Sequence, residues 1–175
     1  MADYSAYKVR SIGSDGIIST VLGTGVTGND ADGSPATSCK IGFSTIFVDS
    51  SSILYYVVNN WYVVRKVTSS GTVLTIAGNT GLITFNGNGL AATSSSIYSA
   101  SSIWSDTTGV LIICDSGHYR IRSVVAGLMY TIAGSGFSGS VNGNDGYATA
   151  ASVVRYPLCL EIQVVSWHFL MDLAM

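Results

Sequence analysis

The chain has 175 residues, which is enough for one domain with a sizeable core. Only 10% of the residues are charged and the formal net charge is −2, so the chain lacks the basic stripe of a nucleic-acid-binding protein. Apolar residues make up 47%, and 20 glycines accompany only 2 prolines. This composition favours β-strands joined by tight turns.

Two apolar stretches, near residues 7–12 and 17–22, predict the first two strands. The second stretch lies within residues 16–23 (GIISTVLG), and this segment returns as residues 71–78 (GTVLTIAG) and 127–134 (GLMYTIAG). A segment that recurs at a nearly constant spacing indicates a repeat protein, in which each repeat is one unit of supersecondary structure.

Residues 41–77 and 101–133 each contain four apolar runs separated by short turns, which predicts two antiparallel meanders. The second run of each, near 53–58 and 110–115, is almost continuously apolar, so both of its faces should be buried. A sheet with two buried faces must lie between other sheets, and the radial stacking of a β-propeller provides this. We therefore predict an all-β fold: a partial β-propeller of four-stranded antiparallel blades, two of them whole, with partial blades at the ends.

Several short motifs recur in a fixed order along the repeats. They are Asp49-Ser50, Leu54-Tyr55, Val64-Arg65-Lys66-Val67, Ile121-Arg122-Ser123-Val124, Thr75-Ile76-Ala77-Gly78 and Asp32-Gly33-Ser34-Pro35-Ala36-Thr37. In this order they resemble the NHL-repeat β-propeller family of the long-insertion type, over residues 9–157. The resemblance implies propeller units near residues 9–63, 64–120 and 121–157. Residues 158–175 carry no repeat motif, and we expect them to be a degenerate or unrelated tail.

An insertion rich in glycine, asparagine and aspartate separates the fourth strand of each repeat from the next repeat. In an antiparallel blade, the turn after the second strand opens on the same side as the connection after the fourth strand. The insertions should therefore share a rim with residues 59–60 and 116–118, and loops of this kind carry function. We predict a binding surface there. Its candidate residues are Asp30, Asp32, Phe85, Asn86, Asn88, His118, Phe137, Asn144, Asp145 and Tyr147.

The clusters of Asx and glycine in the insertions have two interpretations. They partly imitate calcium loops, and a calcium ion takes about six to eight oxygen ligands. The first cluster has Gly28 where a calcium loop begins with an acid, and residues 86–89 contain no carboxylate. Asx side chains that cap their own turns explain the same composition. We expect no cofactor, with calcium as the alternative, and we expect the three cysteines to be buried free thiols.

Arginines recur at one position of the repeat. They are Arg10, Arg65 and Arg122. An arginine inside a blade commonly pairs with a carboxylate, so we expect structural pairs between Arg65 or Arg122 and the nearby acids. The candidate partners are Asp49, Asp106 and Asp115. Recognition of an anionic ligand is the alternative role for these arginines.

No set of residues in the sequence predicts catalysis. His118 and His168 are the only histidines, and no Gly-x-Ser-x-Gly motif accompanies them. We therefore predict no catalytic residue and no metal ligand. The expected function is a binding or scaffold module for a protein, peptide or glycan, acting through the insertion rim. The alternatives are a part of a propeller enzyme, a lyase or hydrolase completed by further blades, and a fragment with no function of its own.

The resemblance also bears on partners, because propellers of this family close with about six blades. Self-association of several copies is therefore a candidate way to complete a ring. We expect no nucleic-acid partner and no membrane span, since Glu161 and Asp172 interrupt the apolar residues 158–175. No signal peptide is recognisable, and the sequence does not assign a compartment.

Overall fold

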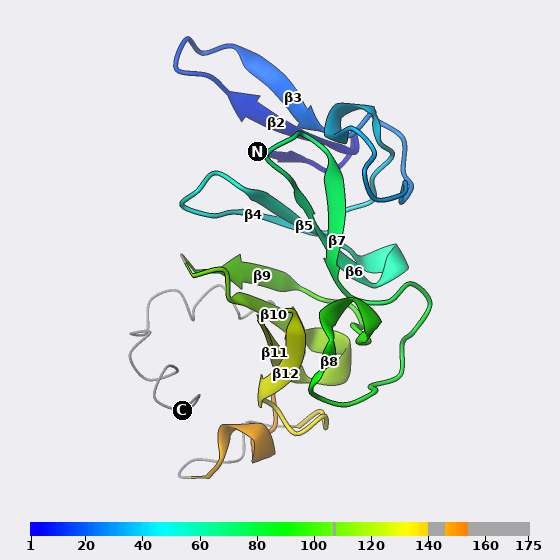
Figure 1. Ribbon diagram of the computed structural model, residues 1–175, viewed down its shortest axis with the longest axis vertical. Helices are drawn as coiled ribbons and strands as arrows, with labels where there is room; N and C mark the ends of the chain where they lie inside the picture. Colours follow the sequence, from blue (N-terminus) through cyan, green and yellow to red (C-terminus); the bar gives the residue numbers. More distant parts are fainter. Residues whose placement is uncertain (107, 140–145, 154–175) are drawn as a thin grey trace.

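The computed structural model of the protein describes residues 1–106, 108–139 and 146–153. Within these ranges the regular structure consists of β-strands and short 3-10 helices, and none of those helices is long and apolar enough to cross a membrane. The strands form three antiparallel sheets that follow one another along the long axis of the molecule (Figure 1).

The first sheet is a partial blade of β1 (Ala2–Asp3), β2 (Lys8–Ile12) and β3 (Ile18–Leu22). The second sheet contains β4 (Thr45–Val48), β5 (Leu54–Val58), β6 (Val63–Val67) and β7 (Val73–Ala77). The third contains β9 (Ser102–Ser105), β10 (Leu111–Asp115), β11 (Arg120–Val125) and β12 (Leu128–Ala133), with β8 (Leu90–Ala91) beside β12. Two four-stranded antiparallel blades after a partial one confirm the predicted all-β partial propeller.

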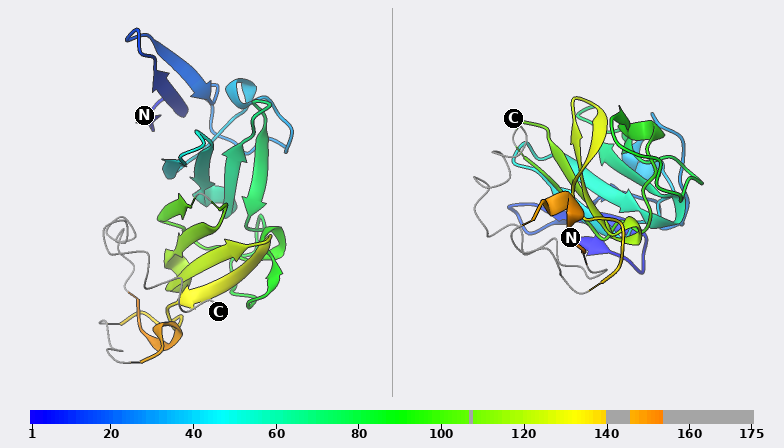
Figure 2. Two further views of the ribbon diagram at one scale, coloured as in Figure 1. Left: turned by 60° about the vertical axis from the view of Figure 1, so that its left-hand side comes forward. Right: turned by 90° about the horizontal axis from the view of Figure 1, so that it is seen from below.

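The first two insertions extend the sheets rather than forming free loops. The second insertion, residues 78–101, provides β8, which pairs with β12 of the blade that follows. The first insertion, residues 23–44, reaches the second sheet in the same way, through a bridge between Pro35 and Thr72. Each of these insertions therefore lies along the outer edge of the next blade, as the two views of Figure 2 show.

Five short 3-10 helices occur in the described ranges. Three lie in the insertions: η1 (Ala36–Ser38), η3 (Ala92–Ser94) and η5 (Ala148–Ala150). The other two, η2 (Asn59–Trp61) and η4 (Ser116–His118), form the turns after β5 and β10. These two turns lie on the same side of the blades as the insertions (Figure 1).

Two apolar clusters hold the three sheets together. One lies between the first and second sheets and includes Leu22 and Tyr56, each 0% exposed. The other lies between the second and third sheets and includes Val57 and Met129. Every residue of β5 is buried, as predicted, and successive residues of this strand enter the two clusters alternately.

The described cysteines differ in state. Cys39 is a buried free thiol in the cluster between the first and second sheets. Cys114 is disulfide-bonded, so the expectation of free thiols throughout is wrong. The expectation failed because a disulfide needs only that two cysteines meet in the fold, whatever their spacing in the sequence.

The glycine that ends each repeated segment is required by a close backbone contact. Gly78 has a φ of 91°, in a region that favours glycine. A Cβ at this position would overlap the carbonyl oxygen of Tyr62, a residue that itself has a φ of 58°. The same overlap would occur between Gly23 and Tyr7 and between Gly134 and Tyr119. The repeated glycine therefore lets the end of each fourth strand lie against the start of the third.

We expect Gly78→Ala to lower the free energy of unfolding by about 3 kcal/mol, because it adds an overlap with backbone to the strain of a positive φ. Gly71→Ala is the matched control. Gly71 has a φ of 77°, but nothing lies within 4 Å of a Cβ there, so we expect a loss of about 1 kcal/mol. Urea unfolding of both variants measures the difference. Equal losses would show that the contact with Tyr62 does not matter.

Candidate functional site

The first insertion is fixed by an arginine buried in the second sheet. Arg65 lies on β6 directly after a β-bulge and is only 1% exposed. Its Nη2 donates to Asp32 Oδ1 at 2.7 Å, and its Nη1 donates to Asn29 Oδ1 at 2.9 Å and to the Asp30 carbonyl at 2.7 Å. The same Asp32 oxygen accepts hydrogen bonds from the backbone N–H and the hydroxyl of Thr75, at 2.9 Å each. We call this arrangement of Arg65, Thr75 and the insertion the first insertion clamp.

The second insertion is held by an equivalent second insertion clamp, built on Arg122, Thr131 and Asn88. Arg122 is 0% exposed, and its Nη2 donates to the Gly87 carbonyl at 2.9 Å. Asn88 Oδ1 accepts from the backbone N–H and the hydroxyl of Thr131, at 2.9 Å each. The carboxylate near this arginine comes from Asp115 of the same sheet, whose Oδ2 lies 3.5 Å from Nη1. Burial lowers the pKa of Arg122, and the charge of Asp115 opposes that shift.

The two clamps correct the predicted arginine partners. Arg65 pairs with Asp32 of the insertion and not with Asp49 or Asp106. Those two aspartates cap their own turns. Asp49 Oδ1 accepts from two backbone N–H groups of the β4–β5 turn, and Asp106 Oδ1 does the same after β9. An aspartate at the end of a strand meets its own turn first, because the nearby N–H groups are unpaired. Asp115 is the predicted partner that the structure places beside an arginine.

Other Asx residues of the predicted binding surface also hold backbone in place. Asp30 Oδ2 accepts from the N–H of Lys40 at 2.9 Å. Asn86 bridges its insertion, since its Oδ1 accepts from the Ser96 N–H and its Nδ2 donates to the Ser94 carbonyl, at 2.9 Å each. These contacts define the shape of the rim.

His118 lies in a buried network below the rim. It is 8% exposed, and its Nδ1 lies 2.8 Å from Asp115 Oδ2. Its Nε2 lies 2.8 Å from the Ile83 carbonyl oxygen, which can only accept, so this nitrogen donates. Asp115 is 0% exposed and also accepts from the Tyr98 N–H at 2.8 Å. The network ties the second insertion to the turn after β10.

His118 also belongs to a group of side chains that we call the rim cluster. This cluster consists of four rings in a row, Tyr62, Tyr98, His118 and Phe85, and of the guanidinium of Arg120. Successive ring centroids are 5.8, 6.0 and 5.9 Å apart from Tyr62 to Phe85. The guanidinium of Arg120 lies 3.8 Å above the ring of Phe85, as in a cation–π contact. Apart from His118, the members are half-buried, so each keeps part of its side chain accessible.

The rim cluster is largely absent from the sequence-based set of binding residues. Phe85 and His118 belong to that set, whereas Tyr62, Tyr98 and Arg120 do not. Gly117 is the residue that marks the position of Tyr98, because a Cβ at Gly117 would overlap both the ring and the carbonyl oxygen of Tyr98. Its N–H donates to that carbonyl at 2.7 Å.

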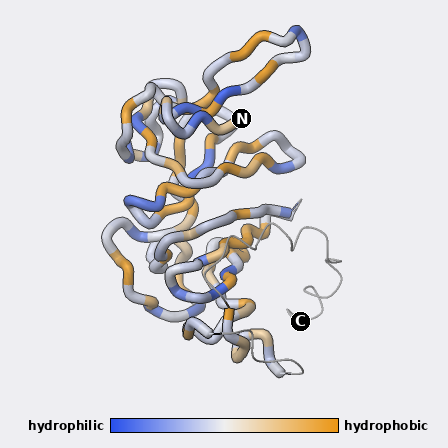
Figure 3. The backbone as a smooth tube through the Cα atoms, turned by 180° about the vertical axis from the view of Figure 1, so that it is seen from behind, coloured by the Kyte–Doolittle hydropathy of each residue, from blue (hydrophilic) through white to orange (hydrophobic). Residues whose placement is uncertain are grey.

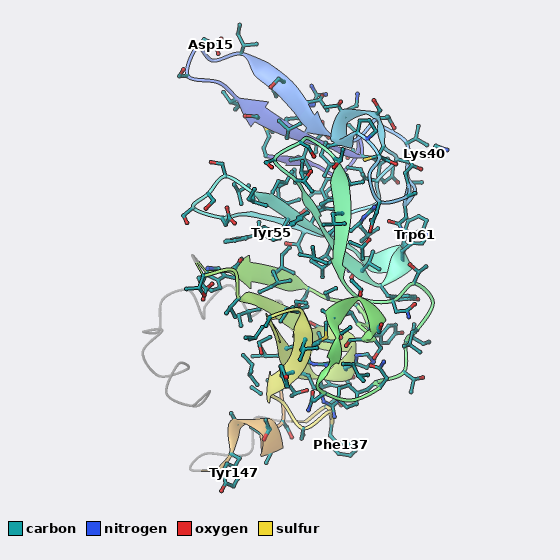
Figure 4. The ribbon with its side chains drawn as sticks, viewed as in Figure 1. Asp15, Lys40, Tyr55, Trp61, Phe137 and Tyr147 are labelled. Atoms are coloured by element: carbon teal, nitrogen blue, oxygen red, sulfur yellow. The ribbon has the colours of Figure 1, made fainter. Side chains whose placement is uncertain are left out.

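The remaining predicted binding residues belong to the third insertion. Phe137 is 74% exposed and Tyr147 is 85% exposed. Both side chains lie at the end of the molecule farthest from the first sheet (Figure 4). Asn144 and Asp145 lie outside the described residues.

A hollow of about 620 Å³ opens between the first and second sheets. Its lining is mostly aliphatic and includes Val9, Ile12, Val21, Ile46 and Leu54. It is bordered by the turns after β4 and β6, so it opens on the side opposite the insertions. Its polar lining comes from Arg10 and Ser11 of β2 and from serine and threonine residues of the two turns.

The described residues contain no group of three or more histidine, cysteine, aspartate or glutamate side chains arranged to hold a metal ion. Of the buried acids and bases, Arg65 is held in the first insertion clamp, and Asp115, His118 and Arg122 contact one another and the backbone. What the insertion rim offers is contact: rigid rings, one stacked cation and fixed loops.

Comparison with known proteins places this architecture among larger propeller-like structures. A Bacteroides thetaiotaomicron structural genomics protein of unknown function matches 86% of the chain, with a TM-score of 0.64 and 16% identity. Auxiliary nutrient binding proteins from Bacteroides thetaiotaomicron and Bacteroides ovatus match 86% and 87%, with TM-scores of 0.60 and 0.59 at 15% and 13% identity. The chain spans 36%, 36% and 37% of these three proteins. At such identities the likeness shows the fold alone.

No protein-family model matches the chain, and none of the curated proteins matches it in sequence.

We expect Asp32→Asn to destabilise the protein by about 1 kcal/mol at neutral pH, because Asp32 is 43% exposed and solvent screens its pair with Arg65. Partial burial opposes the shift, but the hydrogen bonds from Arg65 and Thr75 lower the pKa of Asp32 in the folded state. This stabilisation is present above the unfolded pKa of about 4 and is lost as pH falls through the lower folded value. The stability gap between wild type and variant should therefore close in acid.

Asn88→Asp is the reciprocal control, measured by urea unfolding over the same pH series. Arg122 already lies against Asp115, so a second carboxylate should bring no comparable gain at neutral pH. An Asp32→Asn variant that equals wild type at every pH would show that the first insertion clamp contributes nothing to stability.

Proposed function

We propose that the chain is an NHL-type propeller segment that serves as a binding or scaffold module for a protein, peptide or glycan. The observation that supports this proposal best is the rim cluster, a continuous row of rings on the insertion rim that are half-buried apart from His118. Tyrosine gives a large, rigid contact area with a polar tip, and tyrosine and arginine are enriched among the residues that dominate binding energy.

The rim cluster is also preorganised. Asp115 fixes the backbone of Tyr98, and Arg120 donates to the carbonyl oxygens of His118 and Ser135, at 3.0 Å each. A surface whose side chains are already held loses little conformational entropy when a partner binds. The low charge of the chain, 10%, suits a partner that is neutral or nearly so.

Two of the similar Bacteroides structures are described as auxiliary nutrient binding proteins. A binding role for this chain agrees with those descriptions. The enzyme alternative finds less support, because the buried Arg65, Arg122, Asp115 and His118 are engaged in the insertion clamps and in the His118 network.

The test is selection of ligands on the immobilised chain with a random-peptide phage library and a glycan array. We expect ligands from one of the two, and we expect Tyr62→Ala and Tyr98→Ala each to weaken their binding by roughly tenfold or more. Val48→Ala is the control, since Val48 is 52% exposed at the opposite side of the blade. Thermal unfolding confirms that each variant is folded. Failure of both libraries, or ligands insensitive to both tyrosine variants, would overturn the proposal.

A further inference from the structure

An insertion is received by the last two strands of a sheet, where an arginine faces a threonine, and we call this pair of strands the socket. The socket occurs three times among the described residues. In β6 and β7, Arg65 faces Thr75 across the strand pair, directly after a β-bulge. Arg122 and Thr131 have the same register and the same bulge in β11 and β12. Arg10 and Thr20 repeat the arrangement in β2 and β3, again with a bulge before the arginine.

Two of these sockets are filled by the chain itself, with the same hydrogen bonds. The N–H of Ala36 donates to the Gly71 carbonyl, and the N–H of Ala92 donates to the Gly127 carbonyl, at 2.8 Å each. The insertion then covers the next residues of the outer strand. Val73 in β7 and Met129 in β12 are each 0% exposed, and each also belongs to the apolar cluster between its own sheet and the preceding one.

The first socket differs in what covers it. Ile18, which holds the position of Val73 and Met129, is 50% exposed, and Ile12 on the neighbouring strand is 62% exposed. Among the described residues the ion pair of the Arg10 side chain is with Asp3, at 4.0 Å, and no insertion oxygen bonds to this guanidinium as one does to Arg65 and Arg122. The apolar residues of this hairpin lie at the end of the molecule in Figure 3.

The third insertion carries the matching group at the opposite end of the molecule. Ala148, in η5, holds the position of Ala36 and Ala92. Its carbonyl accepts a hydrogen bond from the N–H of Gly134 at 2.9 Å. The carbonyls of Ala36 and Ala92 accept in the same way from Gly23 and Gly78. Ala36 and Ala92 are 3% and 2% exposed beneath their blades, whereas Ala148 is only half-buried. Its N–H has no acceptor among the described residues.

We propose that copies of this chain associate head to tail, with η5 of one copy seated in the socket of Arg10, Ile18 and Thr20 of the next. The N–H of Ala148 donates to the carbonyl of Gly16, and Tyr147 covers Ile18. The occupant is a second copy because the chain itself carries the segment that fills this socket twice internally. Such a contact joins two different surfaces, so it propagates until a ring closes. It goes beyond the proposed function, since the rim cluster takes no part in it.

The test uses the full chain in sedimentation equilibrium over a series of concentrations. Wild type should exceed the monomer mass of 18.3 kDa as concentration rises. Ile18→Glu places a charge where the partner would bury it, and Ala148→Pro removes the donated N–H at the first position of η5, which tolerates proline. We expect each variant to weaken association by about 100-fold. Leu74→Glu, at a 39% exposed position of the filled strand β7, should leave association unchanged.

Mixing the two variants makes the test specific. Ile18→Glu keeps an intact third insertion and Ala148→Pro keeps an intact socket, so an equimolar mixture should form heterodimers and stop there. Circular dichroism confirms that each variant is folded. A wild type that stays at 18.3 kDa at every concentration, or a mixture that stays monomeric, overturns the proposal.

Discussion

The structure depends on keeping one arginine side chain buried in each of two β-propeller blades. Arg65 and Arg122 are 1% and 0% exposed, and a guanidinium removed from water is costly unless it is paired and hydrogen-bonded. The blade cannot satisfy the whole group, so the insertion must return across the sheet and present its carbonyl and Asx oxygens. This requirement orders a long connection and makes it part of the next blade.

Once the insertion is fixed, the surface beside it becomes rigid as well. The second insertion clamp shares Asp115 with His118 and with the backbone of Tyr98, so a buried charge and a half-buried ring belong to one network. A loop placed in this way holds its side chains in one geometry, as a binding surface requires. The candidate site is therefore a consequence of how each blade accepts the insertion before it.

The sequence predicted what depends on periodicity and missed what depends on distant contacts. The repeated segments and the apolar β5 indicated the blades correctly, because strand burial follows a local pattern. The partner of Arg65 was missed because Asp32 lies 33 residues away in a segment without regular structure. Asp49 was proposed instead, although its nearest unpaired donors belong to its own turn. Tyr98 reached the rim only through the close approach that Gly117 allows.

The two insertion clamps differ in chemistry, and the difference follows from charge. Asp115 ends β10 and faces Arg120, two residues before the buried arginine, whereas Val58 holds that position in β5. Where the blade supplies the carboxylate, the insertion presents the neutral Asn88, and where the blade presents valine, the insertion presents Asp32. Each buried arginine thus pairs with one carboxylate, which neutralises its charge. A second carboxylate at the same arginine would add a negative charge without a partner. Asp3, which faces Lys8, holds the same position in the first sheet, and its carboxylate lies 4.0 Å from Arg10, so this arginine too has a carboxylate from its own sheet.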